Sequence, residues 1–231
     1  MIERPPILIT GVPRSGTSII AKAINMCGAF GGEMSKRGMF GNDRIREEVV
    51  KPYFNDMKMD RTGQYPLPII RNIHIPVDWK QSIEQIITDE GYQEGQWMYK
   101  DARLSLIWPV WDFAFPDAKW IIVRRRTGDI IQSCLKTGFM TAFACKETRK
   151  AIEVDDERNG WLWWVHQYEK RFVEMIEAGL NCTVVWPERM LYGNYQQIYE
   201  TLEWLGLPWN KEIVNLIDPL LWNSRQKERK I

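Results

Sequence analysis

Residues 7–22, ILITGVPRSGTSIIAK, carry the pattern with the clearest chemical meaning in this chain. A short apolar run meets Gly11, and a compact loop then leads into a helical pattern. In such a strand–loop–helix unit, the loop N–H groups and the positive end of the helix dipole converge on one small volume. That volume suits a tetrahedral anion such as a phosphate. Its candidate ligands are the loop residues Arg14, Ser15, Gly16, Thr17 and Ser18.

The loop differs from the Walker A motif G-x-x-x-x-G-K-[ST] of NTPases. The position of the Walker lysine is occupied by Thr17, and the cation of the loop is Arg14. An NTPase also needs a magnesium-binding aspartate at a strand end, whereas the apolar run 120–123 ends in three arginines. A P-loop nucleotide kinase or NTPase therefore remains an alternative, as does a non-catalytic nucleotide-binding module.

Two further segments bring cations and a hydroxyl to strand ends. Arg125 follows the buried run 120–123, and Ser133 lies eight residues later on the next predicted helix. Lys100 ends the short strand predicted at 97–100. Ligands of parallel α/β sheets bind outside the carboxyl ends of the strands, so all three side chains can reach one crevice. The alternatives are a solvated arginine cluster and a surface lysine held in an ion pair.

Strands and helices alternate along the chain, which predicts an α/β fold: a P-loop-like three-layer domain with a central parallel sheet flanked by helices. We expect one domain over residues 1–231, with irregular segments at 60–78 and 138–156. The predicted strands are 7–10, 97–100, 120–123 and 183–186. The predicted helices are 17–27, 43–59, 79–90, 104–115, 128–136, 158–178, 194–205 and 210–217. We expect Pro109 to kink the helix at 104–115 and Ile176 to lie on the apolar face of the helix at 158–178.

The composition argues against several classes of protein. A net charge of +1 gives no general attraction to nucleic acid, and no apolar run reaches the length of a membrane span. The N-terminus lacks a signal-peptide pattern, and the four cysteines form no CxxC pair or zinc pattern. We therefore expect a cytoplasmic protein without a structural metal.

The three chemical segments together resemble the sulfotransferases that use 3′-phosphoadenosine-5′-phosphosulfate (PAPS). Residues 11–18 match the family's loop G-x-P-[RK]-S-G-T-[ST], and Arg125 and Ser133 have the spacing of its 3′-phosphate motif. The segment KDARL is similar to K-D-P-R-L of bacterial sulfotransferases and to K-D-P of tyrosylprotein sulfotransferases. The resemblance covers Ile7–Gly28, Trp97–Leu135 and Thr183–Trp209.

The resemblance implies transfer of a sulfuryl group from PAPS to a hydroxyl or amine without a metal, leaving adenosine 3′,5′-bisphosphate. The loop from Arg14 to Ser18 would hold the 5′-phosphosulfate, and Arg125 and Ser133 the 3′-phosphate. Arg14 and Lys100 would be catalytic cations. The acceptor, which is a small molecule, a carbohydrate or a peptide, would be bound by the variable region at about 29–96.

The general base is the least defined role. Animal cytosolic sulfotransferases place a histidine two residues after the strand lysine, and that position is Ala102 here. Tyrosylprotein sulfotransferases place a glutamate in C-G-E-E after the first helix, and Glu33 in GGEMS has a similar context, shifted by one residue. Glu33 is therefore the predicted base, with Asp43 and Glu47 as substitutes.

Four other residues carry weaker predictions. His74 and His166 are expected to be structural. Trp186 stands near the tyrosine of the family's Y-E-D motif, but a proline follows it. Arg225, in the charged tail, is in the region where the family often has a basic loop for the 3′-phosphate.

Overall fold

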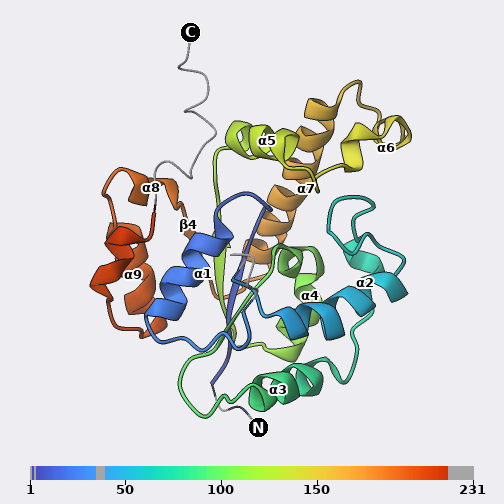
Figure 1. Ribbon diagram of the computed structural model, residues 1–231. Helices are drawn as coiled ribbons and strands as arrows, with labels where there is room; N and C mark the ends of the chain where they lie inside the picture. The colour runs from blue at the N-terminus through green and yellow to red at the C-terminus, as the bar shows by residue number, and fades with distance from the viewer. Residues whose placement is uncertain (1, 3, 35–39, 218–231) are drawn as a thin grey trace.

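A sheet of four parallel strands forms the centre of the protein, in the order β2–β1–β3–β4. The strands are β1 (Ile7–Gly11), β2 (Met98–Lys100), β3 (Lys119–Val123) and β4 (Cys182–Val185). The computed structural model describes residue 2 and residues 4–34 and 40–217, which Figure 1 draws in colour. Every residue of β1 is buried, as expected for a parallel strand covered on both faces. The predicted α/β class and central parallel sheet are confirmed.

Helices cover both faces of this sheet and give three layers (Figure 1). Along β3, Trp120 and Ile122 face one layer, and Ile121 faces the other, because strand side chains alternate. The layer on the Ile121 side contains α1 (Thr17–Met26) and α9 (Gln196–Leu205). The opposite layer contains α3 (Trp79–Asp89), α4 (Trp108–Ala114), α5 (Thr127–Lys136) and α7 (Glu157–Glu177).

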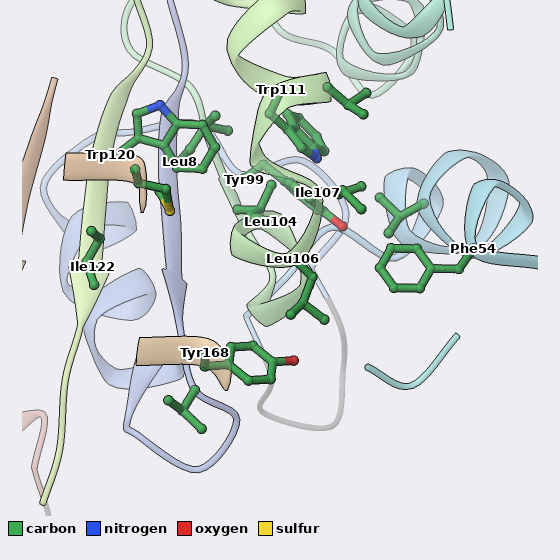
Figure 2. Packing of buried hydrophobic residues seen from close by; sticks show 14 of the residues in the cluster. Leu8, Phe54, Tyr99, Leu104, Leu106, Ile107, Trp111, Trp120, Ile122 and Tyr168 are labelled. Carbon is green, nitrogen blue, oxygen red and sulfur yellow. The ribbon is translucent and has the colours of Figure 1, made fainter. Parts of the chain in front are cut away.

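Aromatic side chains dominate the core on the α4 side of the sheet. Figure 2 shows Tyr99 beside Trp111, and their rings stack with centroids 5.2 Å apart. Trp79 packs edge-on against Trp111 with centroids 5.5 Å apart. Each buried ring removes a large apolar area from water, so the packing of this cluster against Tyr99 stabilises the end of β2. The strand end that carries Lys100 is therefore held rigidly.

Two predicted helices are divided where a proline prevents regular hydrogen bonding. The segment predicted at 43–59 is a π-helical turn, η1 (Ile45–Val50), followed by α2 (Lys51–Asp56), and Pro52 is the second residue of α2. The segment predicted at 104–115 is a 3₁₀ turn, η3 (Ala102–Ile107), followed by α4, with Pro109 in its first turn. Proline has no N–H to donate and its ring crowds the preceding turn, so a new helix starts there.

The remaining differences concern short elements and one helix face. The segment 138–156, predicted to be irregular, contains short helices, and 210–217 holds only a 3₁₀ turn. In α7, Ile176 is 51% exposed, whereas Met175 is buried, because the apolar stripe continues three rather than four residues after Phe172. The short elements not yet named are η2 (Ile70–Asn72), η4 (Ala142–Ala144), α6 (Lys146–Ala151), α8 (Glu188–Leu191) and η5 (Lys211–Asn215).

The strand register brings three strand ends to the same edge of the sheet. Ile9 is paired with Lys100, and Gly11 is paired with Val123. At this carboxyl edge lie the loop between β1 and α1, the end of β2 and the arginines after β3. Figure 1 shows the loop and the start of α5 at this edge.

Candidate active site at the carboxyl edge of the sheet

The loop between β1 and α1 has the backbone of an anion-binding turn. Arg14 (φ 75°) and Gly16 (φ 98°) both adopt the left-handed conformation. Left-handed residues turn successive N–H groups toward one side and create a concave site for an anion. Gly16 also caps α1 with no side-chain hydrogen bond, so the first N–H groups of the helix remain directed toward the loop.

The inside of the loop is tight and polar. Ser15 is fully buried, and its Oγ has no hydrogen-bond partner among the described residues. A Cβ added at Gly11 would lie 2.4 Å from the carbonyl oxygen of Val123 and 2.8 Å from Ser15 Oγ. A buried hydroxyl without a partner beside converging N–H groups fits a site that is completed by an anionic ligand.

Replacing Gly11 with alanine should therefore disrupt the loop. The new methyl group must push the loop away from the Val123 carbonyl, so we expect a loss of stability of about 1–3 kcal/mol and a loss of anion binding. Gly128→Ala is the matched control, because a Cβ at Gly128 meets nothing within 4 Å, and this helical position should gain about 0.4–1 kcal/mol. Urea unfolding of both variants tests this, and equal stabilities would contradict it.

Arg14 connects the loop with the second predicted segment. Its Nε donates to Ser133 Oγ at 2.9 Å, and its carbonyl oxygen accepts from Arg125 Nη1 at 3.1 Å. Arg125 is 9% exposed, and Arg14 is exposed. The structure thus brings Arg14, Arg125 and Ser133 together, as their strand-end and helix positions predicted.

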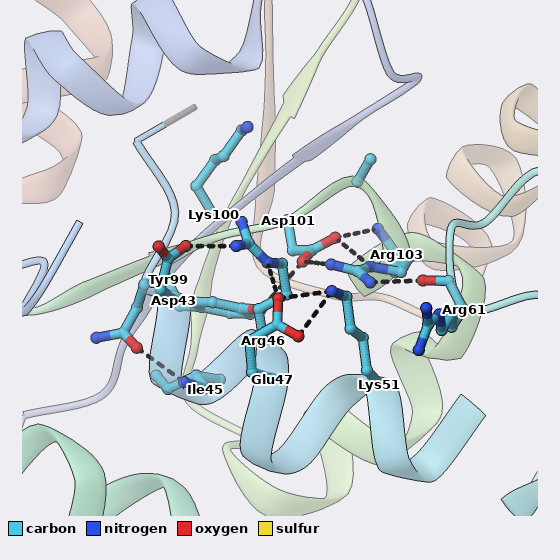
Figure 3. A network of polar contacts seen from close by, with 12 residues as sticks. Asp43, Ile45, Arg46, Glu47, Lys51, Arg61, Tyr99, Lys100, Asp101 and Arg103 are labelled. Atoms are coloured by element: carbon cyan, nitrogen blue, oxygen red, sulfur yellow. Dashed lines mark hydrogen bonds and ion pairs between the residues drawn. The ribbon is translucent and has the colours of Figure 1, made fainter. Parts of the chain in front are cut away.

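Lys100 reaches the loop between β1 and α1 from β2. Its Nζ donates to Ser18 Oγ at 3.3 Å, and Figure 3 shows its side chain pointing away from the neighbouring Asp101–Arg103 pair. Burial lowers the pKa of Lys100 from its usual value near 10.5 to about 8, and Asp101 only partly opposes this. Arg103, Arg46 and Arg14 lower it further. An anion in the loop would relieve this shortage of negative charge.

The low pKa predicts a pH dependence of ligand binding. Lys100 is charged below a pH of about 8, so binding of an anion to the loop should weaken as the pH rises through that value. In Lys100→Arg the cation stays charged, so this component of the pH dependence should disappear. Dissociation constants of adenosine 3′,5′-bisphosphate between pH 7 and pH 9.5, followed by tryptophan fluorescence, test the difference between the two proteins. Identical pH curves would refute it.

A buried ion pair next to Lys100 was not anticipated from the sequence. Arg103 binds Asp101 through two nitrogens, Nε at 2.8 Å and Nη2, and Tyr99 donates to the same carboxylate at 3.1 Å. Arg103 Nη1 also donates to the carbonyl oxygen of Arg61 at 2.7 Å. The dashed lines in Figure 3 follow this network from the end of β2 to the segment after α2. It fixes the backbone that carries Lys100.

Arg124 points away from this centre. It forms an ion pair with Glu169 of α7, and its guanidinium lies 5.2 Å from the centre of the Trp186 ring. The backbone N–H of Trp186 donates to the Gln197 side chain at 2.9 Å. Arg124, which follows β3, thus holds the Trp186 ring beside the end of that strand.

Glu33 is exposed and lies in the segment that follows α1. Its N–H donates to Glu90 Oε2 at 2.8 Å, and its carbonyl oxygen accepts from the Asp43 N–H at 3.2 Å. Asn42 donates to the same Glu90 oxygen at 2.5 Å, so Glu90 contacts both Glu33 and Asn42. A Cβ at Gly41 would lie 2.6 Å from the Lys100 carbonyl oxygen, which places Gly41 against the end of β2.

The substitute bases are engaged in ion pairs. Asp43 lies 2.6 Å and Glu47 3.1 Å from nitrogens of Arg46, and Lys51 contacts Glu47 at 2.5 Å (Figure 3). The hydrogen bond from Lys51 lowers the pKa of Glu47, which weakens it as a base. The spacing of these charges on the helical segment 43–51 is the signal from which their pairing could have been anticipated.

The other sequence predictions fall outside the centre. The carbonyl oxygen of His74 accepts from the Tyr53 hydroxyl at 2.7 Å, and His166 is exposed on α7. Arg225 lies outside the described residues. Residues 4–34 and 40–217 contain no group of three or more His, Cys, Asp or Glu side chains placed to hold a metal ion. Within the same residues, no helix combines the length and the apolar character needed to cross a membrane.

Comparison with known proteins rests on structure alone. No protein-family model and no curated protein sequence matches this chain. Three solved structures match nearly all of it. The sulfotransferase STF9 from Mycobacterium avium is 13% identical with a TM-score of 0.56, over 96% of this chain and 69% of its own.

The other two structures are also sulfotransferases. The sulfotransferase domain from the curacin biosynthetic pathway is 12% identical with a TM-score of 0.60, over 94% of this chain and 79% of its own. The sulfotransferase STF1 from Mycobacterium tuberculosis H37Rv is 13% identical with a TM-score of 0.50, over 94% of this chain and 71% of its own. The chain therefore has the fold of these sulfotransferases.

Proposed function

We propose that the protein is a sulfotransferase that moves a sulfuryl group from PAPS to a hydroxyl or amine of an acceptor by in-line transfer without a metal. The observation that carries the proposal is the meeting of an anion-binding loop with Lys100, Arg125 and Ser133 at one edge of the sheet. The sulfotransferase fold of the chain supports the same assignment.

The cations at the loop are suited to the transfer step. When bound, PAPS would supply the sulfuryl group and a phosphate leaving group. The loop N–H groups and Arg14 would stabilise negative charge on the transferred group, and Lys100 would stabilise the charge that develops on the leaving oxygen. Because Lys100 is half-buried, its charge acts there with little screening by water.

The other end of the donor would be anchored by Arg125 and Ser133. Arg125 is buried at the end of β3, and Ser133 Oγ lies 2.9 Å from Arg14 Nε. A guanidinium and a hydroxyl offer several donors to a phosphate, and a buried arginine loses little side-chain entropy on binding. Donors for two phosphates would favour a nucleotide with phosphates at both the 5′ and 3′ positions.

Glu33 is our proposed general base. Its carbonyl oxygen accepts from the Asp43 N–H, two residues after Gly41, which packs against the end of β2, and its carboxylate has no ion-pair partner among the described residues. Asp43 and Glu47, by contrast, are held by Arg46. If Glu33→Gln leaves turnover intact with a good acceptor, this assignment is wrong.

Ligand binding distinguishes this proposal from a nucleotide kinase. We expect tight, metal-independent binding of adenosine 3′,5′-bisphosphate, and preference for ATP with magnesium would refute it. Arg14→Ala should weaken bisphosphate binding by about 10–100-fold, because it removes a charge-assisted contact. Arg158→Ala, at an exposed position on α7, is the matched control and should bind as the wild type does.

The acceptor must be found by transfer from radiolabelled PAPS. Small phenols, sugars and peptides are the classes to be screened, and we propose that the segment at 29–96 binds the acceptor. Transfer to any of them establishes the enzyme. Binding of the bisphosphate without transfer to any class, or to water, would favour the non-catalytic module.

A further inference from the structure

A carboxyl pair lies beside the arginine to which we assign the 3′-phosphate. Glu188 opens α8, and its Oε1 lies 3.7 Å from Arg125 Nε while its Oε2 lies 3.8 Å from Arg126 Nε. Asp129, in the first turn of α5, is within hydrogen-bonding reach of Glu188. The end of β3, α5 and α8 thus bring two arginines and two carboxyl groups together, and their formal charges cancel.

This arrangement opposes the binding of a phosphate to Arg125 as long as both carboxyl groups are ionised. Only 8% of the Arg125 side chain and 15% of the Glu188 side chain are exposed, so water screens their charges weakly. A phosphate dianion on Arg125 would lie close to the Glu188 carboxylate, and like charges in a poorly hydrated place repel strongly. For the phosphate to bind, the Glu188 carboxylate must either move away from Arg125 or lose its negative charge.

The surroundings of Glu188 favour loss of its charge. Burial raises the pKa of Glu188, and the hydrogen bond and negative charge of Asp129 raise it further, whereas Arg125 and Arg126 oppose this. These are the charged groups that act on Glu188 from the end of β3 and from α5. A phosphate dianion bound to Arg125 would cancel the lowering effect of the two arginines on the pKa of Glu188.

We infer, on the basis of the proposed function, that Glu188 competes with the 3′-phosphate for Arg125, and that the Glu188–Asp129 pair takes up one proton from solvent when the phosphate binds. Protonated Glu188 no longer attracts Arg125, whose N–H groups then donate to the phosphate. By linkage, binding of the proton and of the phosphate strengthen each other. Glu188 thereby becomes a residue that determines specificity at the 3′ position, because a nucleotide with a neutral 3′-hydroxyl has no need of this proton.

The test is to count protons taken up on binding. Calorimetry at pH 7 in buffers of different ionisation enthalpy gives this number for adenosine 3′,5′-bisphosphate and for adenosine 5′-monophosphate. At pH 7, Lys100, with a pKa of about 8, is already mostly charged, and a phosphate with a second pKa of about 6 is mostly a dianion. The wild type should take up more protons with the bisphosphate than with the monophosphate. Glu188→Gln should lose this excess and bind the bisphosphate at least about fivefold more tightly.

Glu169→Gln is the matched control. It removes the carboxylate partner of Arg124, the arginine adjacent to Arg125, and should keep the excess proton uptake of the wild type. No excess in the wild type overturns the inference, whether or not the variants fold, and the proposed function survives if the bisphosphate still binds. Absence of bisphosphate binding by the wild type and both variants overturns the proposed function and the inference together.

Discussion

Replacing Lys100 with methionine is expected to lower the rate of sulfuryl transfer by about 10²–10³-fold, the usual cost of losing one group that stabilises transition-state charge. Lys100 Nζ is the cation that β2 brings to Ser18 at the start of α1. Methionine has a similar length and no charge to desolvate, and burial disfavours the charged form of Lys100. The variant should therefore be at least as stable as the wild type. Transfer from radiolabelled PAPS and urea unfolding measure the two effects separately.

Lys119→Met is the matched control at the opposite end of the sheet. Lys119 begins β3, and its Nζ donates to the Trp204 carbonyl oxygen at 2.6 Å. Its replacement should cost about 0.5–1.5 kcal/mol of stability through the lost hydrogen bond and leave transfer unchanged. Equal losses of activity in the two variants would show that Lys100 has no special role.

Replacing Asp101 with asparagine is expected to lower the free energy of unfolding by about 3–5 kcal/mol, because it leaves the buried Arg103 guanidinium without a counter-charge. The asparagine keeps the shape of the side chain, so the loss reports mainly on charge. Tyr99 also donates to this carboxylate, and its bond weakens in the variant. Urea unfolding at pH 7 measures the difference.

The effect of Asp101→Asn should depend on pH in a defined direction. Burial alone would raise the pKa of Asp101, but the charge and hydrogen bonds of Arg103 outweigh it and hold the pKa below its usual value. The ion pair therefore stabilises the fold above the unfolded-state pKa of about 3.9, and the contribution is lost as the pH falls through the lower folded-state value. The wild type and the variant should converge in stability at low pH.

A more exposed ion pair provides the control for this prediction. In the Arg124–Glu169 pair, 38% of the arginine and 23% of the glutamate side chain are exposed. Glu169→Gln should therefore cost only about 0–1 kcal/mol. A loss of similar size in Asp101→Asn would mean that the buried pair contributes no more than a surface pair, contrary to our expectation.

The elements around the phosphate loop were predictable because their signals are local. An apolar run, two glycines and a helical period are sufficient to define β1, the loop and α1. The same holds for β3 and α5, and their spacing led correctly to the meeting of Arg125 and Ser133 with the loop. The divided helices at Pro52 and Pro109 were also signalled locally, by the prolines themselves. A kink was expected at Pro109, whereas the prediction extended regular helix through Pro52.

The contacts that charged residues make in the folded protein could not be predicted from such signals. Asp101 and Arg103 are two residues apart in KDAR, but their buried network also needs the Tyr99 hydroxyl and the carbonyl oxygen of Arg61. Glu188 carries no signal in the sequence that relates it to Arg125, because the turn that opens α8 brings it there. Each of these contacts depends on how the layers pack.

The sequence by itself therefore determined the α/β class, the glycine-containing turn between β1 and α1, and which cationic residues follow the strands. Periodicity and turn residues specify those features within one or two elements. Only the tertiary structure decided which polar side chains meet: Lys100 with Ser18, Arg14 with Ser133, and Glu188 with Arg125. The physical reason is that the strand order β2–β1–β3–β4 and the crossover helices, not sequence spacing, set which strand ends are neighbours at the carboxyl edge of the sheet.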